Sequence, residues 1–515
     1  MSKSRTAVVL LVAVVLLAIF VDRSILIRLL WVRTLAPLTL AALVVVAAIG
    51  AGFLARRMRL GDPVLDFAVG YPMFGALCFL VGTLRISTAT MLPLVLVFAG
   101  IGALSMIRGR AGAVVPLHAT LVVVFVCAFV WAQAPPVSLD ELAYHLAIPH
   151  TWVLEGRALD LPLLSHSYFP LGIESADLPL LTMLDPFGGG IASHFLHLAA
   201  AIAATTLLFR LTRGNFLATA AIVTTPALAI MAGWSMDDLP LLAVCAALTL
   251  ALAEADLVTV TAAIAAGLLT KYTFLPFAGI ALVVTLMREG WRSGESQALR
   301  NRVFRAVAIG AVIGSLFFIR NTILTGNPVA PFFGASAPHV SGYRAPASLA
   351  AYVFDGAFVD EALGITLFIP AVLATGVMPW ALFILGAALF LLAPSARLLL
   401  PFFAIPAAIG GRHLTGRVVK VFVILGIAFQ TFLIAHYTLV NEPWAPLAGK
   451  YSDEQFVAAR RTSYPAIAWL NATLPVDSRT LVIGIQETYW FERKVRGGGN
   501  FDSARMSRYL ETPTP

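Results

Sequence analysis

The residues best suited to chemistry lie in one polar stretch, SLDELAYHLAIPHTWVLEGR, which follows a long apolar run. The stretch contains two adjacent carboxylates, Asp140 and Glu141, and a carboxylate can accept a proton from a hydroxyl group or orient it. The alternative is that Asp140 caps a helix at the membrane surface, because Asp side chains bind the free N–H groups of a first turn. Spacing alone leaves both interpretations open.

A helix that starts near Ser138 would arrange these side chains in pairs. Asp140 and Tyr144 would share one face, and Glu141 and His145 would share the next, because residues four apart are neighbours on a helix. Two residues are expected to break this helix: Pro149 and Gly156.

A second acid pair, Asp237 and Asp238, occurs in GWSMDDLPLL at the end of another apolar run. The alternative to a site is an ordinary helix start, because carboxylates in a first turn interact favourably with the helix dipole. Two acid pairs on one side of one protein indicate a site more strongly than either pair alone.

Three cations lie at the same predicted boundary: Lys271 in GLLTKYTFLP, Arg320 in FFIRNTILTGNPVAPFFG and Arg397 in SARLLLPFFAIP. Ionisable groups at membrane depth are costly and usually face a cavity or a partner. The alternative is that each side chain reaches out to lipid headgroups. Three cations beside carboxylates favour a site for an anionic lipid headgroup, and we predict that the three converge on it.

The histidines raise the question of a metal. His194 and His197 are three residues apart and could form a metal pair, but no third ligand has suitable spacing, so two satisfied helix-end histidines are the preferred interpretation. A divalent metal is left open. The sequence has no phosphate-binding loop, dinucleotide glycine motif or HExxH, which argues against a nucleotide-driven enzyme.

The elements that must position these residues are membrane helices. The chain of 515 residues is 59% hydrophobic and 12% charged, with a mean hydropathy of +0.89, whereas soluble domains have about 25% charged residues. Many apolar runs reach roughly the length that spans a bilayer, and a membrane barrel would show short alternating strands instead. The composition predicts an all-α polytopic membrane protein.

About fifteen apolar spans are predicted, each long enough or nearly long enough to cross a membrane. They lie near 7–21, 35–55, 66–84, 91–107, 113–133, 191–209, 216–232, 239–253, 257–270, 274–287, 304–319, 363–375, 377–393, 398–410 and 418–438. The region 363–393 could hold two short helices or one long tilted helix. The first span is expected to be retained, because no small-residue cleavage site follows it.

Basic residues set the predicted orientation, because Arg and Lys gather in cytoplasmic loops. The net charge of +8 has this explanation, and nucleic acid is not an expected partner. We predict a multi-pass protein of the bacterial inner membrane with a cytoplasmic N-terminus and a periplasmic C-terminus. The acid pairs and the loops 134–190 and 320–362 then lie outside.

Three regions are predicted along the chain. Residues 1–130 form N-terminal transmembrane helices, 131–440 a transmembrane core with outer loops, and 441–515 a small periplasmic tail. The tail contains AIAWL and then RTLVIGI, a helix-like run followed by a strand-like run, so we expect it to be a small α/β unit.

Taken in order, these motifs resemble the polytopic glycosyltransferases of the C superfamily (GT-C), in particular the bacterial dolichyl-phosphate-mannose-protein-mannosyltransferase-like group. DELAYHLAIPHTWVLEGR and YFPLGIESADLPLL are similar to its first outer loop, and SMDDLPLL is similar to the acidic start of a later helix. GLLTKYTFLP, RNTILTGNPVAPFF, ARLLLPFFAIP and AIAWLNATLPVDSRTLVIG resemble further family segments. Four predicted spans precede the one that usually carries the acidic loop, and the resemblance does not explain them.

The resemblance implies a GT-C-like helical bundle that takes a sugar from a polyprenyl-phosphate carrier. The acceptor would be a glycan, a lipid or a protein, membrane lipids would surround the bundle, and metal dependence varies within the family. The rivals are a transporter or flippase of lipid-linked sugars, which would carry its charges near the membrane midplane, and a non-catalytic envelope assembly protein.

The predicted roles follow from this chemistry. Asp140 is the first choice to deprotonate the acceptor hydroxyl, Glu141 is the second, and Asp237 is a further catalytic candidate. We expect burial to raise the pKa of Asp140. The remaining candidates are expected to bind substrate: Tyr144, His145, Asp238, Lys271, Tyr272, Arg320, Asn321 and Arg397.

Overall fold

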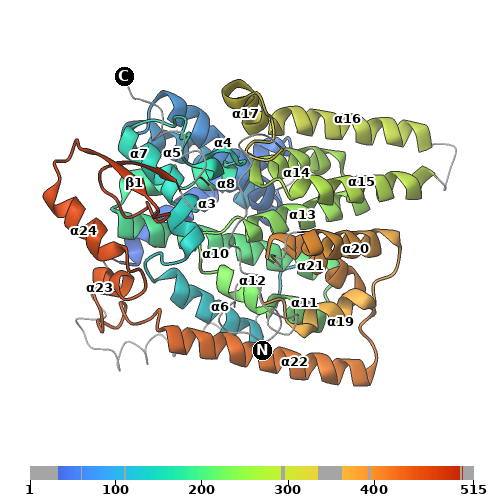
Figure 1. The fold of residues 1–515 in the computed structure, drawn as a ribbon. Helices are drawn as coiled ribbons and strands as arrows, with labels where there is room; N and C mark the ends of the chain where they lie inside the picture. Colours follow the sequence, from blue (N-terminus) through green and yellow to red (C-terminus); the bar gives the residue numbers. More distant parts are fainter. Residues whose placement is uncertain are drawn as a thin grey trace.

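The computed structural model describes residues 33–58, 61–109, 112–116, 118–290, 296–333, 362–392, 395, 397–498 and 502. The predicted span 7–21, most of the loop 320–362 and the end of the tail lie outside the described residues. Figure 1 shows a bundle of helices with a small unit of helices and strands at one end.

Several helices have the length and composition of membrane spans. Within the described residues five helices qualify: α3 (Leu35–Ala55), α4 (Pro63–Leu84), α5 (Thr88–Arg108), α10 (Pro186–Leu211) and α22 (Arg417–Asn441). A bent pair, α16 (Ser296–Gly314) and α17 (Leu316–Thr325), qualifies as a sixth if the two are one span, with 52° between its halves. The chain is therefore an integral membrane protein, and the larger predicted number of spans stays a prediction.

The N-terminal helices α3, α4 and α5 pack together as one group, with α3 in contact with both others. The start of α4 is specified locally. Pro63 occupies the first position, where its missing N–H costs nothing, and the Asp62 carboxylate accepts from the N–H of Val64 at 3.2 Å.

Two polar contacts tie this group to the rest of the bundle. The Arg56 guanidinium binds the Asp66 carboxylate at 2.7 Å and the Thr259 hydroxyl of α14 at 3.0 Å. The Arg210 guanidinium of α10 binds the Asp62 carboxylate at 2.5 Å. Because buried charges are costly unless paired, these contacts fix the position of the N-terminal group against α10 and α14.

The first loop is built from short helical segments between α6 (Ala119–Ala132) and α10. They are the π-helix η2 (Glu141–His145), α7 (Ala147–Glu155), the 3₁₀ turn η3 (Ser165–Tyr168), α8 (Gly172–Ser175) and α9 (Leu178–Met183). α8 packs very closely on α4, since a Cβ atom added at Gly75 of α4 would come within 1.6 Å of the Gly172 carbonyl oxygen of α8. Only glycine allows this approach, which brings the first loop onto the bundle.

The centre of the bundle consists mostly of shorter apolar helices around α10, the most buried of the five long ones. They are α11 (Phe216–Val223), α12 (Pro226–Met231), α13 (Asp238–Ala253), α14 (Leu257–Thr270) and α15 (Phe274–Gly290). The predicted span 216–232 is thus two helices. The break falls before Pro226, which has no N–H to donate to the preceding turn.

The region 363–393 also contains two helices, α19 (Ile365–Val372) and α20 (Val377–Leu392), so the two-helix alternative is the correct one. Between them Gly376 has a φ of 97°, a left-handed conformation that glycine adopts readily. Both helices pack against α21 (Leu400–Gly410), which follows the short turn η5 (Arg397–Leu399) and ends at η6 (Gly411–His413).

The last long helix and the tail complete the structure. α22 runs along one edge of the bundle and contacts α6, α11 and α12. The tail holds α23 (Asp453–Ala458), α24 (Tyr464–Thr473), β1 (Arg479–Ile483) and β2 (Lys494–Gly498). The strands pair in parallel with Arg479 opposite Lys494. The order of helix and then strand is the one that the sequence indicates, and the side of the membrane stays a prediction.

The tail packs on the first loop through a separate apolar cluster. Leu142 and Leu146 of the loop meet Tyr489, Trp490 and Phe491 of the tail there. The backbone N–H groups of residues 488 and 489 donate to the Leu142 carbonyl oxygen at 3.0 and 3.2 Å. The tail is therefore attached to the segment that carries the first acid pair.

Candidate active site

The first acid pair lies where a helical segment begins, as the sequence indicates. The Ser138 N–H donates to the Glu141 carboxylate at 3.1 Å, which closes the first turn. The Tyr144 hydroxyl donates to the Asp140 carboxylate at 3.0 Å, so these two side chains do share a face. Asp140 makes no capping hydrogen bond of its own, and the helix-cap interpretation of this residue is wrong.

The expected ends of this helix are only half right. Gly156 ends α7 with a φ of 74°. Pro149 does not break the helix, because it lies in the first turn of α7, which starts at Ala147. The first N–H groups of a helix have no partner within the helix, so a proline there removes no hydrogen bond.

Glu141 is completely buried and holds three segments together. Its carboxylate accepts from the Ser138 N–H, from the Ser235 N–H at 2.6 Å, and binds His194 Nε2 of α10 at 2.7 Å. Burial raises the pKa of Glu141, but His194 and the two backbone donors lower it further, so the net pKa lies below its ordinary value. The carboxylate is thus kept ionised and fixed in place.

Asp140 forms an ion pair with Arg397, which reaches it from η5. Burial raises the pKa of the Asp140 carboxyl, but the guanidinium of Arg397, with smaller contributions from His145 and His166, brings it well below its usual range. The expectation that this pKa would be raised is therefore wrong. The reason is the cation, whose attraction for the ionised form exceeds the cost of burial.

The second acid pair binds Lys271, which follows α14. The Lys271 ammonium lies 2.6 Å from the Asp237 carboxylate and 2.8 Å from that of Asp238. Burial lowers the pKa of Lys271, but the two carboxylates raise it by more, so the ammonium form is favoured. Asp238 does open α13, but neither acid caps the helix with its side chain. The Lys271 ammonium is thus bound by two carboxylates of this chain.

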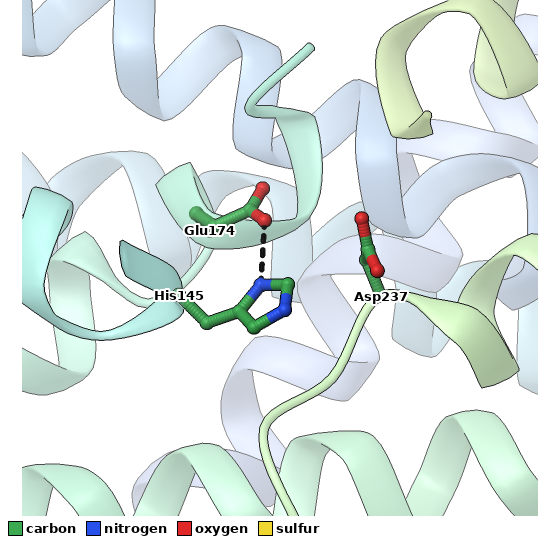
Figure 2. Close-up of side chains that lie close together, drawn as sticks. All are labelled: His145, Glu174 and Asp237. Atoms are coloured by element: carbon green, nitrogen blue, oxygen red, sulfur yellow. Dashed lines mark hydrogen bonds and ion pairs between the residues drawn. The ribbon is translucent and has the colours of Figure 1, made fainter. Parts of the chain in front are cut away.

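Glu174 completes a buried group that Figure 2 shows, with His145 and Asp237. His145 Nδ1 lies 2.9 Å from Glu174 Oε1, and one ligand atom from each of the three residues lies within 4.8 Å of the others. The other oxygen, Glu174 Oε2, is buried without a hydrogen-bond partner among the described residues. Burial raises the pKa of Glu174 and His145 lowers it, with a net rise.

This group has the donor types of a transition-metal site. One imidazole nitrogen and two carboxylate oxygens suit Zn²⁺ or a similar divalent ion, and Glu174 Oε2, which has no hydrogen-bond partner among the described residues, is a donor that a cation could use. Lys271, however, already neutralises part of the charge on Asp237. Sequence reasoning missed Glu174, although it lies in the motif YFPLGIESADLPLL.

The histidine pair of α10 is not a metal site. His194 Nε2 binds Glu141, whereas His197 Nδ1 lies 2.9 Å from the Ser193 carbonyl oxygen and its ring faces Tyr71. Both histidines are buried, and they lie within α10 rather than at its end. The expectation of two satisfied histidines is only partly correct, because the buried His194 Nδ1 has no hydrogen-bond partner among the described residues.

Arg320, Asn321 and Tyr272 gather around the turn η3. Arg320 Nη1 donates to the Ser167 carbonyl oxygen at 2.6 Å. Asn321 Nδ2 and the Tyr272 hydroxyl both donate to the Tyr168 carbonyl oxygen, at 2.6 and 3.1 Å. Of the three predicted cations, Lys271 and Arg397 form ion pairs with the carboxylates of the two acid pairs. Arg320 of α17 instead binds the backbone of η3.

The tail contributes to the surroundings of Asp140, which sequence reasoning did not foresee. A small hollow of about 20 Å³ is lined by Asp140, Tyr144 and His166 together with Gln486 and Asp502 of the tail. That volume is enough for about one water molecule. The His166 ring stacks on the Tyr144 ring at a centroid distance of 4.3 Å, so η3 reaches the acid pair.

Comparison with known proteins gives one similarity of structure. No protein family matches the sequence, and no curated protein matches it. The chain is similar to the crystal structure of ArnT from Cupriavidus metallidurans bound to undecaprenyl phosphate, with 15% sequence identity and a TM-score of 0.47. The similarity covers 76% of this chain and 86% of that one.

Proposed function

We propose that this chain is a GT-C-type glycosyltransferase that transfers a sugar from a polyprenyl-phosphate carrier to an acceptor at the periplasmic face of the bacterial inner membrane. The observation that supports this most directly is the ion pair of Asp140 with Arg397. It holds a carboxylate on a cation that a phosphate group can also bind, next to a hollow between the first loop and the tail. The sugar is proposed to be a hexose, and the acceptor a glycan, lipid or protein hydroxyl.

In this proposal the donor phosphate exchanges for Asp140 on Arg397. Arginine binds phosphate and carboxylate with the same fork of N–H groups, so the two anions compete for it. When Arg397 turns to the phosphate, Asp140 loses the charge that lowers its pKa and becomes a stronger base. The paired state without donor would then keep the base inactive.

The transfer step follows from this exchange. The acceptor hydroxyl gives its proton to Asp140, and its oxygen forms a bond to the anomeric carbon of the sugar. The bond between that carbon and the phosphate oxygen breaks, and its electron pair leaves with the carrier phosphate. Arg397 faces the charge that develops on the phosphate, which is a common source of catalysis.

The other predicted residues support the reaction in different ways. Glu141 is engaged by three partners, so we propose that it positions the loop rather than accepting a proton. Lys271, held between Asp237 and Asp238, stabilises the start of α13 beside the site.

We also propose that His145, Glu174 and Asp237 hold a divalent cation. A bound Zn²⁺ or similar ion would supply positive charge to a phosphate or hydroxyl oxygen. α8 carries Glu174 against α4, and His145 is the last residue of η2.

One observation favours the transporter alternative, the 52° bend between α16 and α17, because broken helices are common in transporters. The paired carboxylates and cations argue against it, since they lie on loop segments and helix ends.

The test is a transfer assay with the purified full-length protein and a polyprenyl-phosphate-linked sugar. Asp140→Asn removes the charge but keeps the shape. A positioned general base contributes roughly 100- to 10,000-fold in rate, so transfer should fall by that factor while folding and donor binding persist. Near-normal transfer by Asp140→Asn would reject the proposed base, and movement of the lipid without transfer by the wild type would favour the flippase.

A further inference from the structure

The Tyr144 ring, whose hydroxyl donates to Asp140, is in contact with two imidazole rings. The His166 ring of η3 stacks on it at a centroid distance of 4.3 Å, with 12° between the ring planes. The adjacent His145 ring lies 4.1 Å away at an angle of 43°. Aromatic pairs contribute more to stability than their buried area accounts for, and they favour particular ring orientations. The direction of the Tyr144 hydroxyl therefore depends on His166, which belongs to a different segment of the first loop.

The backbone of η3 is fixed on both sides of His166. The Ser165 N–H donates to the Asp502 carboxylate of the tail at 2.8 Å. The Arg320 guanidinium of α17 donates to the Ser167 carbonyl oxygen at 2.6 Å. Two elements far apart in the sequence, α17 and the tail, thus fix the backbone from which the His166 ring extends.

The two groups that bind the Asp140 carboxylate share one of its oxygens. The Tyr144 hydroxyl and the Arg397 guanidinium both bind Oδ2, which leaves Oδ1 to accept the proton of the acceptor hydroxyl. When Arg397 turns to the donor phosphate, the Tyr144 hydroxyl is the one of these two contacts that remains. The orientation of Oδ1 during transfer then depends on Tyr144.

We propose that His166 is a positioning residue for the proposed base, Asp140, and that it acts through Tyr144. This role rests on the proposed function. The His166 ring holds the Tyr144 ring, and the Tyr144 hydroxyl holds Asp140 Oδ2, so that Oδ1 keeps its direction after Arg397 has left. All three of these side chains line the small hollow beside the tail, so the acceptor hydroxyl would meet them there.

The contact requires a flat ring at position 166 rather than a charge. Burial lowers the pKa of His166 to about 4, although the Asp140 carboxylate opposes the shift, so the imidazole is neutral near pH 7. Phenylalanine is also a neutral flat ring and can stack on tyrosine. His166→Phe should therefore preserve the positioning that His166→Ala removes.

The test is steady-state sugar transfer by the purified full-length protein. His166→Ala should lower kcat about 3- to 10-fold, the factor that an aromatic pair supplies, and leave the KM for the donor within about twofold of the wild type. His166→Phe should recover roughly half or more of the wild-type kcat. If His166→Ala does not fold, His166→Leu, which fills the space without a ring, replaces it with the same expected loss.

A double variant tests whether His166 acts through Tyr144. Tyr144→Phe keeps the ring and removes the hydroxyl, and it should lower kcat about tenfold or more, because a hydrogen bond to a charged group is worth about that factor. Adding His166→Ala to Tyr144→Phe should cost less than about twofold more, since residues that act through one group are not additive. Tyr451→Phe, the same change at a tyrosine of the tail that contacts Lys450, is the matched control and should keep the wild-type kcat.

Three results would overturn the positioning role. The first is a wild-type kcat in a folded His166→Ala variant. The second is a His166→Phe variant as slow as His166→Ala, which is the result expected if the imidazole binds the acceptor directly. The third is a double variant in which the two losses multiply, because His166 would then act independently of Tyr144.

Melting temperatures in detergent measure the ring contact without any transfer. His166→Ala and Tyr144→Ala should each lower the melting temperature, and together they should lower it by less than the sum, because the two rings are in contact. If the wild type transfers no sugar, the proposed function is wrong and the role of His166 in it is wrong as well. If the wild type transfers sugar and His166→Ala keeps its kcat, the positioning role is wrong and the function stands.

Discussion

The two adjacent carboxylates of the first loop differ in what surrounds them. The Glu141 side chain is fully buried, and its oxygens meet His194 and two backbone N–H groups. The Asp140 side chain is 23% exposed and is paired with a cation that phosphate can bind. The two side chains carry the same carboxylate group but are expected to have different roles. Glu141 is held by three hydrogen-bond partners, whereas Asp140 can exchange Arg397 for another partner.

Glu141→Gln should lower the stability of the protein much more than Asp140→Asn. The amide of Gln places an N–H group where the Glu141 carboxylate accepts from two backbone N–H groups and binds His194, and leaving such buried groups without an acceptor costs about 1–3 kcal/mol each, whereas Asp140 is partly exposed. Thermal unfolding in detergent measures the difference, and Asp140→Asn is the matched control. Similar melting temperatures for the two variants would show that Glu141 does not hold the loop.

The purified protein should contain a divalent cation, because His145, Glu174 and Asp237 bring three donor atoms within 4.8 Å of one another. Elemental analysis should find about one ion per chain, and His145→Ala and Glu174→Ala should each reduce its affinity about 10- to 100-fold or more. His413→Ala, which changes a histidine away from this group, should leave the metal content unchanged. A metal-free wild type after growth and purification with added Zn²⁺ would exclude the site.

At the scale of elements, the site depends on how short segments are held. η2 is held by α10 through the contact of His194 with Glu141. It is also held by the tail, whose backbone N–H groups donate to the Leu142 carbonyl oxygen. His150 of α7 adds a further link, since its Nε2 lies 2.9 Å from the Phe491 carbonyl oxygen. The tail thus helps to hold the first loop in place, although it follows the last long helix in sequence.

Acidification should loosen this link between α7 and the tail. Burial lowers the pKa of His150 to about 4, although the hydrogen bond to Phe491 opposes the shift. Between pH of about 6.5, the ordinary histidine value, and pH 4, the unfolded state binds the proton and the folded state does not, so stability falls as pH falls. A shift of this size corresponds to about 3 kcal/mol.

The measurement is the melting temperature from pH 7.5 to 4.5 for the wild type and His150→Gln. The variant should begin less stable at pH 7.5 and lose less stability on acidification. Parallel pH profiles would show that another group causes the loss.

At the scale of the whole molecule, the exposed apolar faces define a protein embedded in lipid. α22 shows this most clearly, since only 22% of the residues in its most apolar stretch are buried inside the protein. In α10, 89% of the corresponding residues are buried, and this helix lies at the centre of the bundle. The site lies where loop segments, the start of α13 and the tail meet.

A reporter that is active only in the periplasm, fused after Asn441, should be active. Basic residues Arg412, Arg417 and Lys420 precede α22, which is long enough to span the membrane, and such residues gather on the cytoplasmic side. A cytoplasmic reporter fused at the same residue is the control and should be silent. The opposite pair of results would reverse the orientation and place the candidate site on the cytoplasmic side.

The sequence by itself determined the membrane class, the segments that carry the acids and cations, and the helix-then-strand order of the tail. These features follow from local properties. Apolar length decides what can span a bilayer, and spacing along a helix decides that Tyr144 faces Asp140. The break at Pro226 is equally local, although the span prediction passed over it.

The tertiary structure alone decided which acid meets which cation. Arg397 is 257 positions from Asp140 in the chain, and Lys271 is 34 from Asp237. Sequence spacing contains no information about such pairs, and the pairing reversed the expected pKa shift of Asp140. Glu174 and the tail reached the site in the same way, through the packing of α8 on α4 and of an apolar cluster on η2. Burial and long-range contact, rather than residue type, set the chemistry there.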